Sequence, residues 1–214
     1  MSEHTHIIGK GAAIRFENLD TDQIMPKQFL RGIDKAGLDK GVLFDQRFDT
    51  HGNLRPEFVL NRPEYADTRI LVGGANFGCG SSREHAVWGL QQFGIRAVIA
   101  PSFGEIFYSN AMNNRLLLVM LPRDVIEALM DAVDADSHNA IAFDLQTMQV
   151  TTPIGTFPFE LSARHRSMFL QGLDMIGLSL RQRADIERFA QQYWQAYPWT
   201  KNVAQRTRER LGTT

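Results

Sequence analysis

The hydrophobic pattern is clearest in the middle of the chain, where three short apolar runs follow one another. They are Arg69–Gly74, Ile95–Ala100 and Leu116–Leu121, and each is closed by glycine or proline. Runs of this length between such residues are typical of strands that are buried on both faces. We therefore predict three buried strands in this region.

Two segments with helical character lie between these runs. In Ser82–Phe93 the apolar side chains recur at roughly helical intervals, and Gly94 supplies a stop signal. Phe103–Asn114 is a second helical candidate. The order strand, helix, strand, helix, strand is that of right-handed parallel crossovers, in which helices pack on a parallel sheet. The middle of the chain therefore predicts an α/β fold.

The flanking segments have a different character. Residues 1–66 are rich in Gly, Asp and Pro, and they predict loops and short strands with a turn at 49–53. Further along, Asp124–Val133 has a helical pattern, Ile141–Val150 alternates like a strand, and Thr156–Glu160 resembles the second arm of a hairpin. We predict a small antiparallel layer in this part.

The last part of the chain, Ala184–Arg210, has a polar helical pattern that Pro198 interrupts. No linker separates independent domains. We expect a single α/β domain with a mostly parallel central sheet, flanking helices and a β-rich accessory layer. We assign residues 1–190 to this domain and residues 191–214 to a C-terminal helical tail.

Charge and hydropathy narrow the class of function. Of the 214 residues, 23 are Lys or Arg and 24 are Asp or Glu, so the formal net charge is −1. The sequence lacks the basic excess of nucleic-acid-binding proteins, and its apolar runs are far shorter than the ~20 residues of a membrane span. The first residues do not have the pattern of a secretory signal. We expect no nucleic-acid or membrane binding and a cytoplasmic location.

The single cysteine, Cys79, limits the metal chemistry of the chain. One thiol cannot hold a structural zinc ion or an iron–sulfur cluster, which take three or four such ligands. The histidines have no matching ligand partners, so we expect no metal site in this chain. A thiolate beside His85 at a helix start could act as a nucleophile, but small buried cysteines are commoner.

The most informative segment is Gly73–Glu84, a glycine-rich turn that leads from a predicted strand into a predicted helix. Glycines let the backbone approach a ligand, and the N–H groups of a helix start favour a carboxylate or phosphate. Gly78 and Gly80 would allow such N–H groups to converge. The spacing matches neither the dinucleotide fingerprint, the phosphate-binding loop with its lysine, nor the nucleophile elbow.

Two interpretations of the polar residues in this segment stay open at this point. Arg83 can grip a carboxylate in a bidentate way, and Ser81 and Ser82 can donate hydrogen bonds or move a proton beside it. Alternatively, Ser81-x-x-Glu84 has the spacing of a capping box, in which Ser81 has only a structural role.

Several segments resemble the small subunits of bacterial 3-isopropylmalate dehydratases, relatives of the swivelling fourth domain of aconitase. They cover roughly residues 8–190 and occur in the family's order. The segments are Asn18–Leu30, Phe58–Asn61, Asn76–His85, Ala100–Phe107, Asn113–Leu117 and Gly172–Leu180.

The resemblance implies a swivelling domain and a hydro-lyase reaction in leucine biosynthesis. The family isomerises 2-isopropylmalate and 3-isopropylmalate, which are small hydroxy acids, by dehydration and rehydration. The reaction needs a base for a C–H proton and a Lewis acid for the leaving hydroxide. In the family a [4Fe-4S] cluster on a separate large subunit is the Lewis acid. We therefore expect that this chain binds no cofactor and pairs with such a subunit.

The resemblance also implies roles for individual residues. Ser81 matches the catalytic serine of the family, and Ser82 and Arg83 match its contacts to a substrate carboxylate. Thr21 and Asp22 lie in a second loop that faces the site. A structural role remains open for this loop, because Asp-rich turns and caps are common.

The resemblance to the family does not by itself choose the substrate. Related small subunits serve enzymes for citramalate-like, homocitrate-like or citrate-like acids, because fold alone does not choose the substrate. Arg31 follows the second loop where relatives set specificity, and it could pair with an extra carboxylate or point to solvent. A non-catalytic carboxylate-binding module is the alternative from a different class of function.

Overall fold

The structure is a computed structural model that describes residues 5–30 and 35–212. The chain divides into two compact units, Met1–Asp174 and Met175–Thr214. The boundary that we assigned at residue 190 lies inside the second unit. The division into a swivelling domain and a tail stays a prediction, and each unit is described by itself below.

The first unit is built on a mixed sheet, to which the described residues contribute seven strands in the order β4-β3-β2-β1-β5-β6-β7. Strands β1 to β4 run parallel to one another, and β5 to β7 extend the sheet in antiparallel pairing from β1. The strands are β1 (His6–Ile14), β2 (Thr68–Gly73), β3 (Ala97–Ala100), β4 (Leu117–Met120), β5 (Ala140–Asp144), β6 (Gln149–Thr152) and β7 (Gly155–Pro158).

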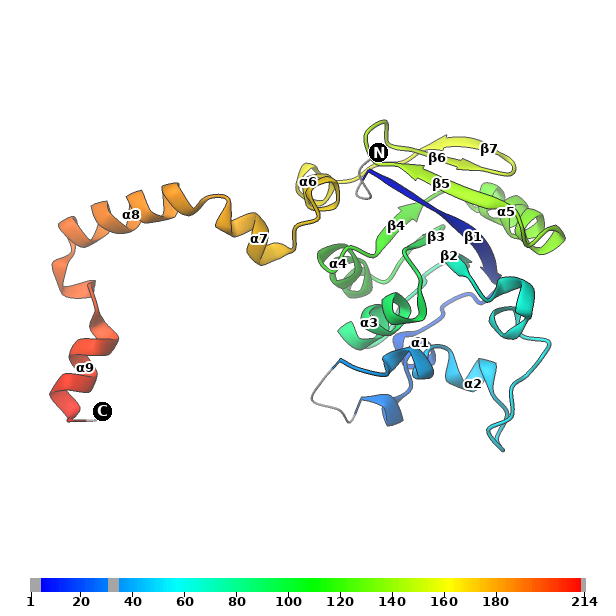
Figure 1. The fold of residues 1–214 in the computed structure, drawn as a ribbon, viewed down its shortest axis with the longest axis horizontal. Helices are drawn as coiled ribbons and strands as arrows, with labels where there is room; N and C mark the ends of the chain where they lie inside the picture. Colours follow the sequence, from blue (N-terminus) through cyan, green and yellow to red (C-terminus); the bar gives the residue numbers. More distant parts are fainter. Residues whose placement is uncertain (1–4, 31–34, 213–214) are drawn as a thin grey trace. The chain divides into compact units, whose positions relative to one another are not determined.

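Helices cover both faces of the parallel strands. Figure 1 shows α3 (Glu84–Phe93) and α4 (Glu105–Asn113) beside each other on one side and α5 (Arg123–Ala135) on the other. The buried face of α5 includes Ile126, Leu129 and Val133, which recur at helical spacing. The other helices of this unit are α1 (Thr21–Ile24), α2 (Phe44–Arg47) and α6 (Ala163–Gln171).

The predictions for the middle of the chain are confirmed. All three apolar runs form strands of the parallel half, and their side chains in β2 and β3 are almost completely buried. The predicted helices form between them, and Gly94 ends α3 in the left-handed conformation with φ 111°. The α/β fold class is therefore confirmed, and the antiparallel strands continue the central sheet.

The prediction of loops and short strands at the N-terminus is wrong for β1, which has nine residues and joins the two halves of the sheet. Its sequence alternates poorly because glycines interrupt it. A Cβ on Gly11 would lie 2.9 Å from Ile141 and 3.0 Å from Val133, so the glycine is needed for close packing. The strand is specified by its neighbours in the fold.

The single strand predicted for Ile141–Val150 is also wrong, because a turn divides it into β5 and β6. The Asp144 carboxylate accepts hydrogen bonds from the N–H groups of Gln146 and Thr147, at 2.7 and 3.2 Å. Such a side chain stabilises a turn. The hairpin predicted after it is confirmed, since β7 pairs with β6.

The second unit is helical, as the sequence predicts. It consists of α7 (Met175–Leu180), α8 (Arg183–Ala196) and α9 (Val203–Leu211), with a 3-10 turn at Pro198–Thr200 between the last two helices. Aromatic rings follow one side of α8, with centroids 5.7 Å apart for Phe189 and Tyr193. Within the ranges that the structure describes, no helix has both the length and the apolar character that a membrane span requires.

Candidate active site

The candidate site lies where three loops leave the carboxyl ends of parallel strands. Residues 15–20 follow β1, residues 74–83 follow β2, and residues 101–104 follow β3. In open sheets with parallel strands, ligands bind outside this edge. The glycine-rich segment of the sequence analysis is the loop after β2, so the fold places it at the expected edge.

Backbone hydrogen bonds join the first two loops. The N–H of Gly78 donates to the carbonyl of Leu19 at 2.7 Å, and the N–H of Thr21 donates to the carbonyl of Cys79 at 2.9 Å. The Gly78 N–H is therefore used within the fold. The two loops form one hydrogen-bonded unit.

Gly78 is required by close packing as well as by its backbone conformation. Its φ is +74°, which side chains rarely adopt. A Cβ at this position would lie 2.2 Å from Cγ of Phe107, on α4. The turn can therefore approach α4 only without a side chain here.

A capping box starts α1 and sets the position of the second loop. The carboxylate of Asp20 accepts from the N–H of Gln23 at 2.7 Å, and the Gln23 side chain accepts from the N–H of Asp20 at 3.0 Å. This is the arrangement that stabilises a helix start. Thr21 and Asp22 therefore occupy the first turn of α1, where the sequence had indicated a loop.

The capping interpretation of Ser81 is wrong. Helix α3 begins at Glu84 and its N-cap is Arg83, for which the described residues provide no side-chain cap. Ser81 lies two positions before the cap, and its hydroxyl Oγ donates to Oδ1 of Asp22 at 3.1 Å. The hydroxyl is exposed at the site and is held by a side chain of the other loop.

Thr21 holds the backbone of Ser81 through a hydrogen bond. Its side chain is buried, and its hydroxyl donates to the backbone carbonyl of Ser81 at 2.7 Å. The two hydroxyl oxygens are 3.3 Å apart. Thr21 thus fixes the backbone of Ser81 and lies close to its hydroxyl.

Arg83 completes the cluster with an ion pair to Asp22. The Arg83 side chain retains 19% of its exposure and the Asp22 side chain 42%, so the pair lies partly in solvent. Asp22 therefore holds both the hydroxyl of Ser81 and the guanidinium of Arg83. A guanidinium in this place can bind a carboxylate if Asp22 shares or releases it.

Ser82, Arg31 and Cys79 are the other residues that the sequence singled out. Ser82 is exposed next to Ser81 in the same loop. Arg31 lies outside the described residues. The thiol of Cys79 is partly buried and donates to the carbonyl of Asn18 at 3.3 Å, which agrees with a packing role better than with an open nucleophile.

The start of α3 is held by Asn114, for which the sequence indicates no such role. Asn114, which follows α4, donates from its side-chain amide to the carboxylate of Glu84. The indole N–H of Trp88 donates to Asn114 in turn, at 3.1 Å. Asn114 therefore links the second and third crossovers of the sheet behind the site, and no local pattern in the sequence indicates this.

A charged pair borders the site on the loop after β1. Arg123 lies 2.9 Å from Glu17 and lowers the pKa of the Glu17 carboxyl, chiefly through a hydrogen bond. Glu17 also accepts from the N–H of Ala75, at 3.2 Å. This carboxylate is satisfied within the fold.

The donor set of the described residues does not fit a metal ion or an iron–sulfur cluster. No three His, Cys, Asp or Glu side chains of that part of the chain come together as ligands. The one cysteine is engaged with a backbone carbonyl. The site therefore offers a hydroxyl, a carboxylate and a guanidinium as its chemical groups.

Comparison with known proteins places these features in a family. The model of the aconitase C-terminal domain matches residues 1–124. The chain is 59% identical to 3-isopropylmalate dehydratase small subunit 1 of Chromobacterium violaceum over 211 residues, 99% of this chain and 100% of that one. It is 46% identical to the corresponding small subunit of Phenylobacterium zucineum, over 95% of this chain and 100% of that one.

A solved structure has the same fold. The crystal structure of 3-isopropylmalate dehydratase from Methanocaldococcus jannaschii is similar with a TM-score of 0.62 and 28% sequence identity. The similarity covers 86% of this chain and 99% of the other.

Proposed function

This chain belongs to the family of 3-isopropylmalate dehydratase small subunits, and on that premise we propose that it forms one half of the active site of a hydro-lyase. The enzyme isomerises 2-isopropylmalate and 3-isopropylmalate in leucine biosynthesis, in the cytoplasm. The observation that carries the proposal is the cluster of Ser81, Asp22 and Arg83 at the carboxyl end of the parallel strands. The chain thereby presents a proton-transfer group beside a carboxylate-binding group.

Ser81 is the base in this proposal. Its hydroxyl is exposed and free of a capping duty, so it can reach a C–H proton of a bound substrate. A serine hydroxyl is a weak acid, and its deprotonation needs nearby positive charge. Arg83 supplies that charge two residues away, and Asp22, which accepts the hydrogen bond from the hydroxyl, is placed to take up its proton.

Arg83 and Ser82 bind a substrate carboxylate, and Thr21 and Asp22 line the same site from α1. A carboxylate arriving at Arg83 competes with Asp22 for the guanidinium. Binding then replaces the internal ion pair by an ion pair with the substrate, and the partly exposed Asp22 carboxylate keeps the hydroxyl of Ser81 as its donor. Arg31 is proposed to contact the group that distinguishes one hydroxy acid from another.

The Lewis acid comes from a partner in this proposal. A [4Fe-4S] cluster held by the large subunit would supply the Lewis acidity that a leaving hydroxide needs, and the single cysteine of this chain is too few ligands to hold such a cluster. The name of the relatives as small subunits supports a large-subunit partner. This chain contributes binding, orientation and the movement of one proton.

Activity with and without the large subunit tests the proposal. The purified chain alone is expected to be folded, colourless and inactive, and turnover of 2-isopropylmalate is expected only after addition of an iron-loaded large subunit. Iron content, visible absorbance and turnover are measured on both samples. Turnover by this chain alone would contradict the partition of function.

The substrate is tested by the same reconstituted enzyme. Citramalate-like, homocitrate-like and citrate-like acids are compared with 2-isopropylmalate by kcat/KM. A higher kcat/KM for one of these acids would move the chain to a related hydro-lyase. Tight binding of a carboxylate without any turnover in the reconstituted pair would favour a non-catalytic module.

A further inference from the structure

A cleft of about 620 Å³ lies at the opposite edge of the parallel sheet from the candidate active site. Its lining includes residues at the amino ends of neighbouring strands: Arg69 in β2, Arg96 just before β3 and Arg115 just before β4. Two loops of the candidate active site leave the other ends of β2 and β3. The cleft is therefore a separate site, and its volume is in the range of small-molecule pockets.

The three arginines are neighbours in the sheet. The backbone N–H of Arg96 donates to the carbonyl of Arg69 at 2.7 Å, and the N–H of Leu117 donates to the carbonyl of Arg96 at 3.1 Å. Arg115 is two residues before Leu117 and has a φ of 62°, which is unusual for a residue with a side chain. The fold thus gathers three guanidinium groups along one edge.

These guanidinium groups form no salt bridge with a carboxylate of the described part of the chain; Arg69 acts only through its charge on Asp67, whose pKa it helps to lower and whose salt bridge is to Lys10. Arg96 and Arg115 donate to the backbone carbonyls of Gln91 and Gly172, both at distances near 2.9 Å. Neither these two nor Arg69 forms an ion pair with a described carboxylate, and the lining of the cleft contains no Asp or Glu. Three exposed positive charges therefore face one cleft in a chain whose net charge is −1.

The surroundings leave room for a ligand at these charges. A Cβ on Gly9 of β1 would lie 2.6 Å from Cβ of Arg69, so the glycine gives space to the arginine side chain. Gln91 and Asn114 add amide groups to the lining. Donors of two kinds therefore surround the cleft, and acidic groups do not.

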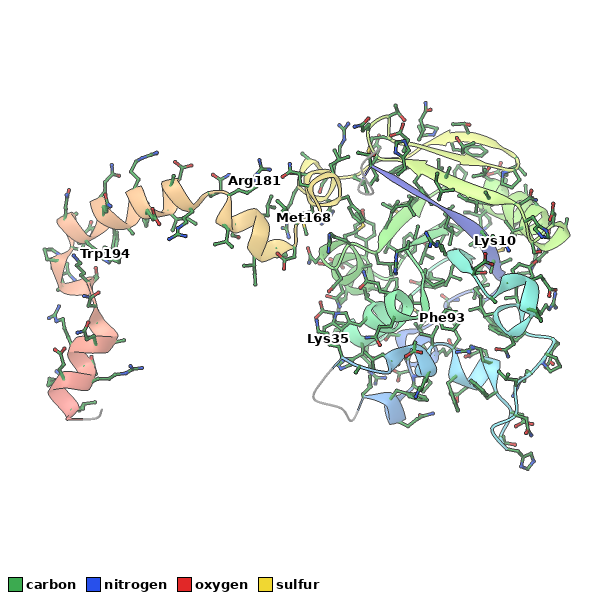
Figure 2. All side chains as sticks on the ribbon, in the orientation of Figure 1. Lys10, Lys35, Phe93, Met168, Arg181 and Trp194 are labelled. Atoms are coloured by element: carbon green, nitrogen blue, oxygen red, sulfur yellow. The ribbon has the colours of Figure 1, made fainter. Side chains whose placement is uncertain are left out.

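A second hollow of about 340 Å³ continues the cleft along α3 and shares Gln91, Arg96 and Asn114 with it. This hollow adds Lys35, labelled in Figure 2, whose ammonium lies 3.8 Å from the centroid of the Trp88 ring. The positive character thus extends beyond the first cleft.

We propose that this cleft binds a small polyanion with two or more phosphate or carboxylate groups. A guanidinium group can bind a phosphate or a carboxylate through two N–H donors at once. Several guanidinium groups along one side of the cleft favour a ligand that carries several negative charges. The proposal does not rest on the proposed catalytic function, since the lining contains none of Ser81, Asp22 and Arg83; of its residues, Asn114 also holds Glu84 at the start of α3. An occupant here contacts the starts of β2 to β4, and the ends of β2 and β3 carry loops of the candidate active site.

Calorimetric titration of the full chain with pyrophosphate and, separately, with citrate tests the proposal at constant ionic strength. We expect saturable binding of at least one of them at a single site. Arg69→Gln, Arg96→Gln and Arg115→Gln are each expected to weaken it at least about tenfold, the effect of losing a charge-assisted hydrogen bond. Arg69→Lys, which keeps the charge but loses the fork, is expected to fall between Arg69→Gln and the parent.

Two control variants make the result specific. Arg55→Gln removes an exposed arginine outside the cleft that also donates to a backbone carbonyl, that of Phe48 at 2.9 Å, and should not change the affinity. Arg83→Gln removes the anion-binding group of the candidate active site and should also leave it unchanged. Thermal melting checks that every variant is folded.

The outcomes distinguish the sources of the ligand. Preference for pyrophosphate assigns the cleft to phosphate esters, and preference for citrate assigns it to polycarboxylates. Absence of saturable binding at millimolar concentrations, or loss of binding only in Arg83→Gln, would overturn the proposal. Binding of a polyglutamate chain without binding of either small anion would also overturn it and would assign the surface to an acidic polypeptide.

Discussion

Replacement of Ser81 by alanine tests the central residue of the proposed site. The change removes a hydroxyl that contacts Asp22 at 3.1 Å and lies 3.3 Å from the hydroxyl of Thr21. A hydrogen bond of this kind contributes about 0.5–1.5 kcal/mol to stability, and Ser81 is exposed, so the low end applies. For a chain of this size, 1 kcal/mol corresponds to a shift in Tm of about 2–4 °C. We therefore expect a nearly normal melting temperature.

The expected kinetic effect is much larger. Removal of a general base lowers kcat by about 10²–10⁴, which corresponds to about 2.7–5.4 kcal/mol in the activation barrier. The assay measures kcat in both directions on the complex with the large subunit, with the amount of bound subunit as a check on assembly. Catalysis should fall at least a hundredfold while association is retained.

Ser162 provides the matched control. It is the N-cap of α6, and its hydroxyl accepts from the N–H of His165 at 3.2 Å. Ser162→Ala should cost about 0.5–2 kcal/mol of stability with unchanged kcat. If Ser81→Ala instead behaves like Ser162→Ala, losing stability but turning over substrate normally, the assignment of Ser81 as the base is refuted.

Three further changes have defined outcomes. Arg83→Lys should lower kcat/KM about ten- to hundredfold, because the bidentate geometry is lost, and unchanged steady-state kinetics would restrict Arg83 to its ion pair. Gly78→Ala should lower the free energy of unfolding in urea by about 2–5 kcal/mol, because of the left-handed backbone and the contact with Phe107. The control is Gly52→Ala, at a φ of +82° with nothing within 4 Å of the added Cβ, which should lose only the backbone contribution. Equal losses of stability in the two variants would contradict the packing argument. Burial lowers the pKa of His165, so the unfolded chain binds its proton more readily and stability should fall as pH drops below about 6.5; melting curves of His165→Gln should show a smaller fall, and an identical fall would contradict this.

The elements that local pattern specifies were predictable from the sequence. The strands and helices between residues 68 and 121 each carry their own apolar run or helical spacing, and all of them except α4 end at or near Gly or Pro. Strand β1 was not predictable in this way, because Gly9 and Gly11 are required by neighbours that are distant in sequence. The turn between β5 and β6 depends on Asp144, one polar residue in an alternating segment.

The candidate site shows the same limit. The motif around Ser81 identified the right residue types, but its spacing also matched a capping box, and only the start of α3 at Glu84 removes that alternative. The true capping box belongs to Asp20 and Gln23. Asp22 holds Ser81 and Arg83 together only because two loops separated by 59 residues pair in the fold, and the hydrogen bond from Ser81 to Asp22 joins these loops.

The central position of β1 has a consequence for synthesis of the chain on the ribosome. This strand emerges before both of its partners, because its two edges pair with β2 and β5, whose partner residues extend from Thr68 to Asp144. Until the ribosome has passed Asp144, one edge of an apolar nascent strand lacks its partner and can pair with another chain. Pairing between distant segments also slows folding. We therefore expect the nascent chain to depend on chaperones most strongly while residues 68–144 are being synthesised. Aggregation should be more sensitive to translation speed in this interval than during synthesis of the helical C-terminal unit.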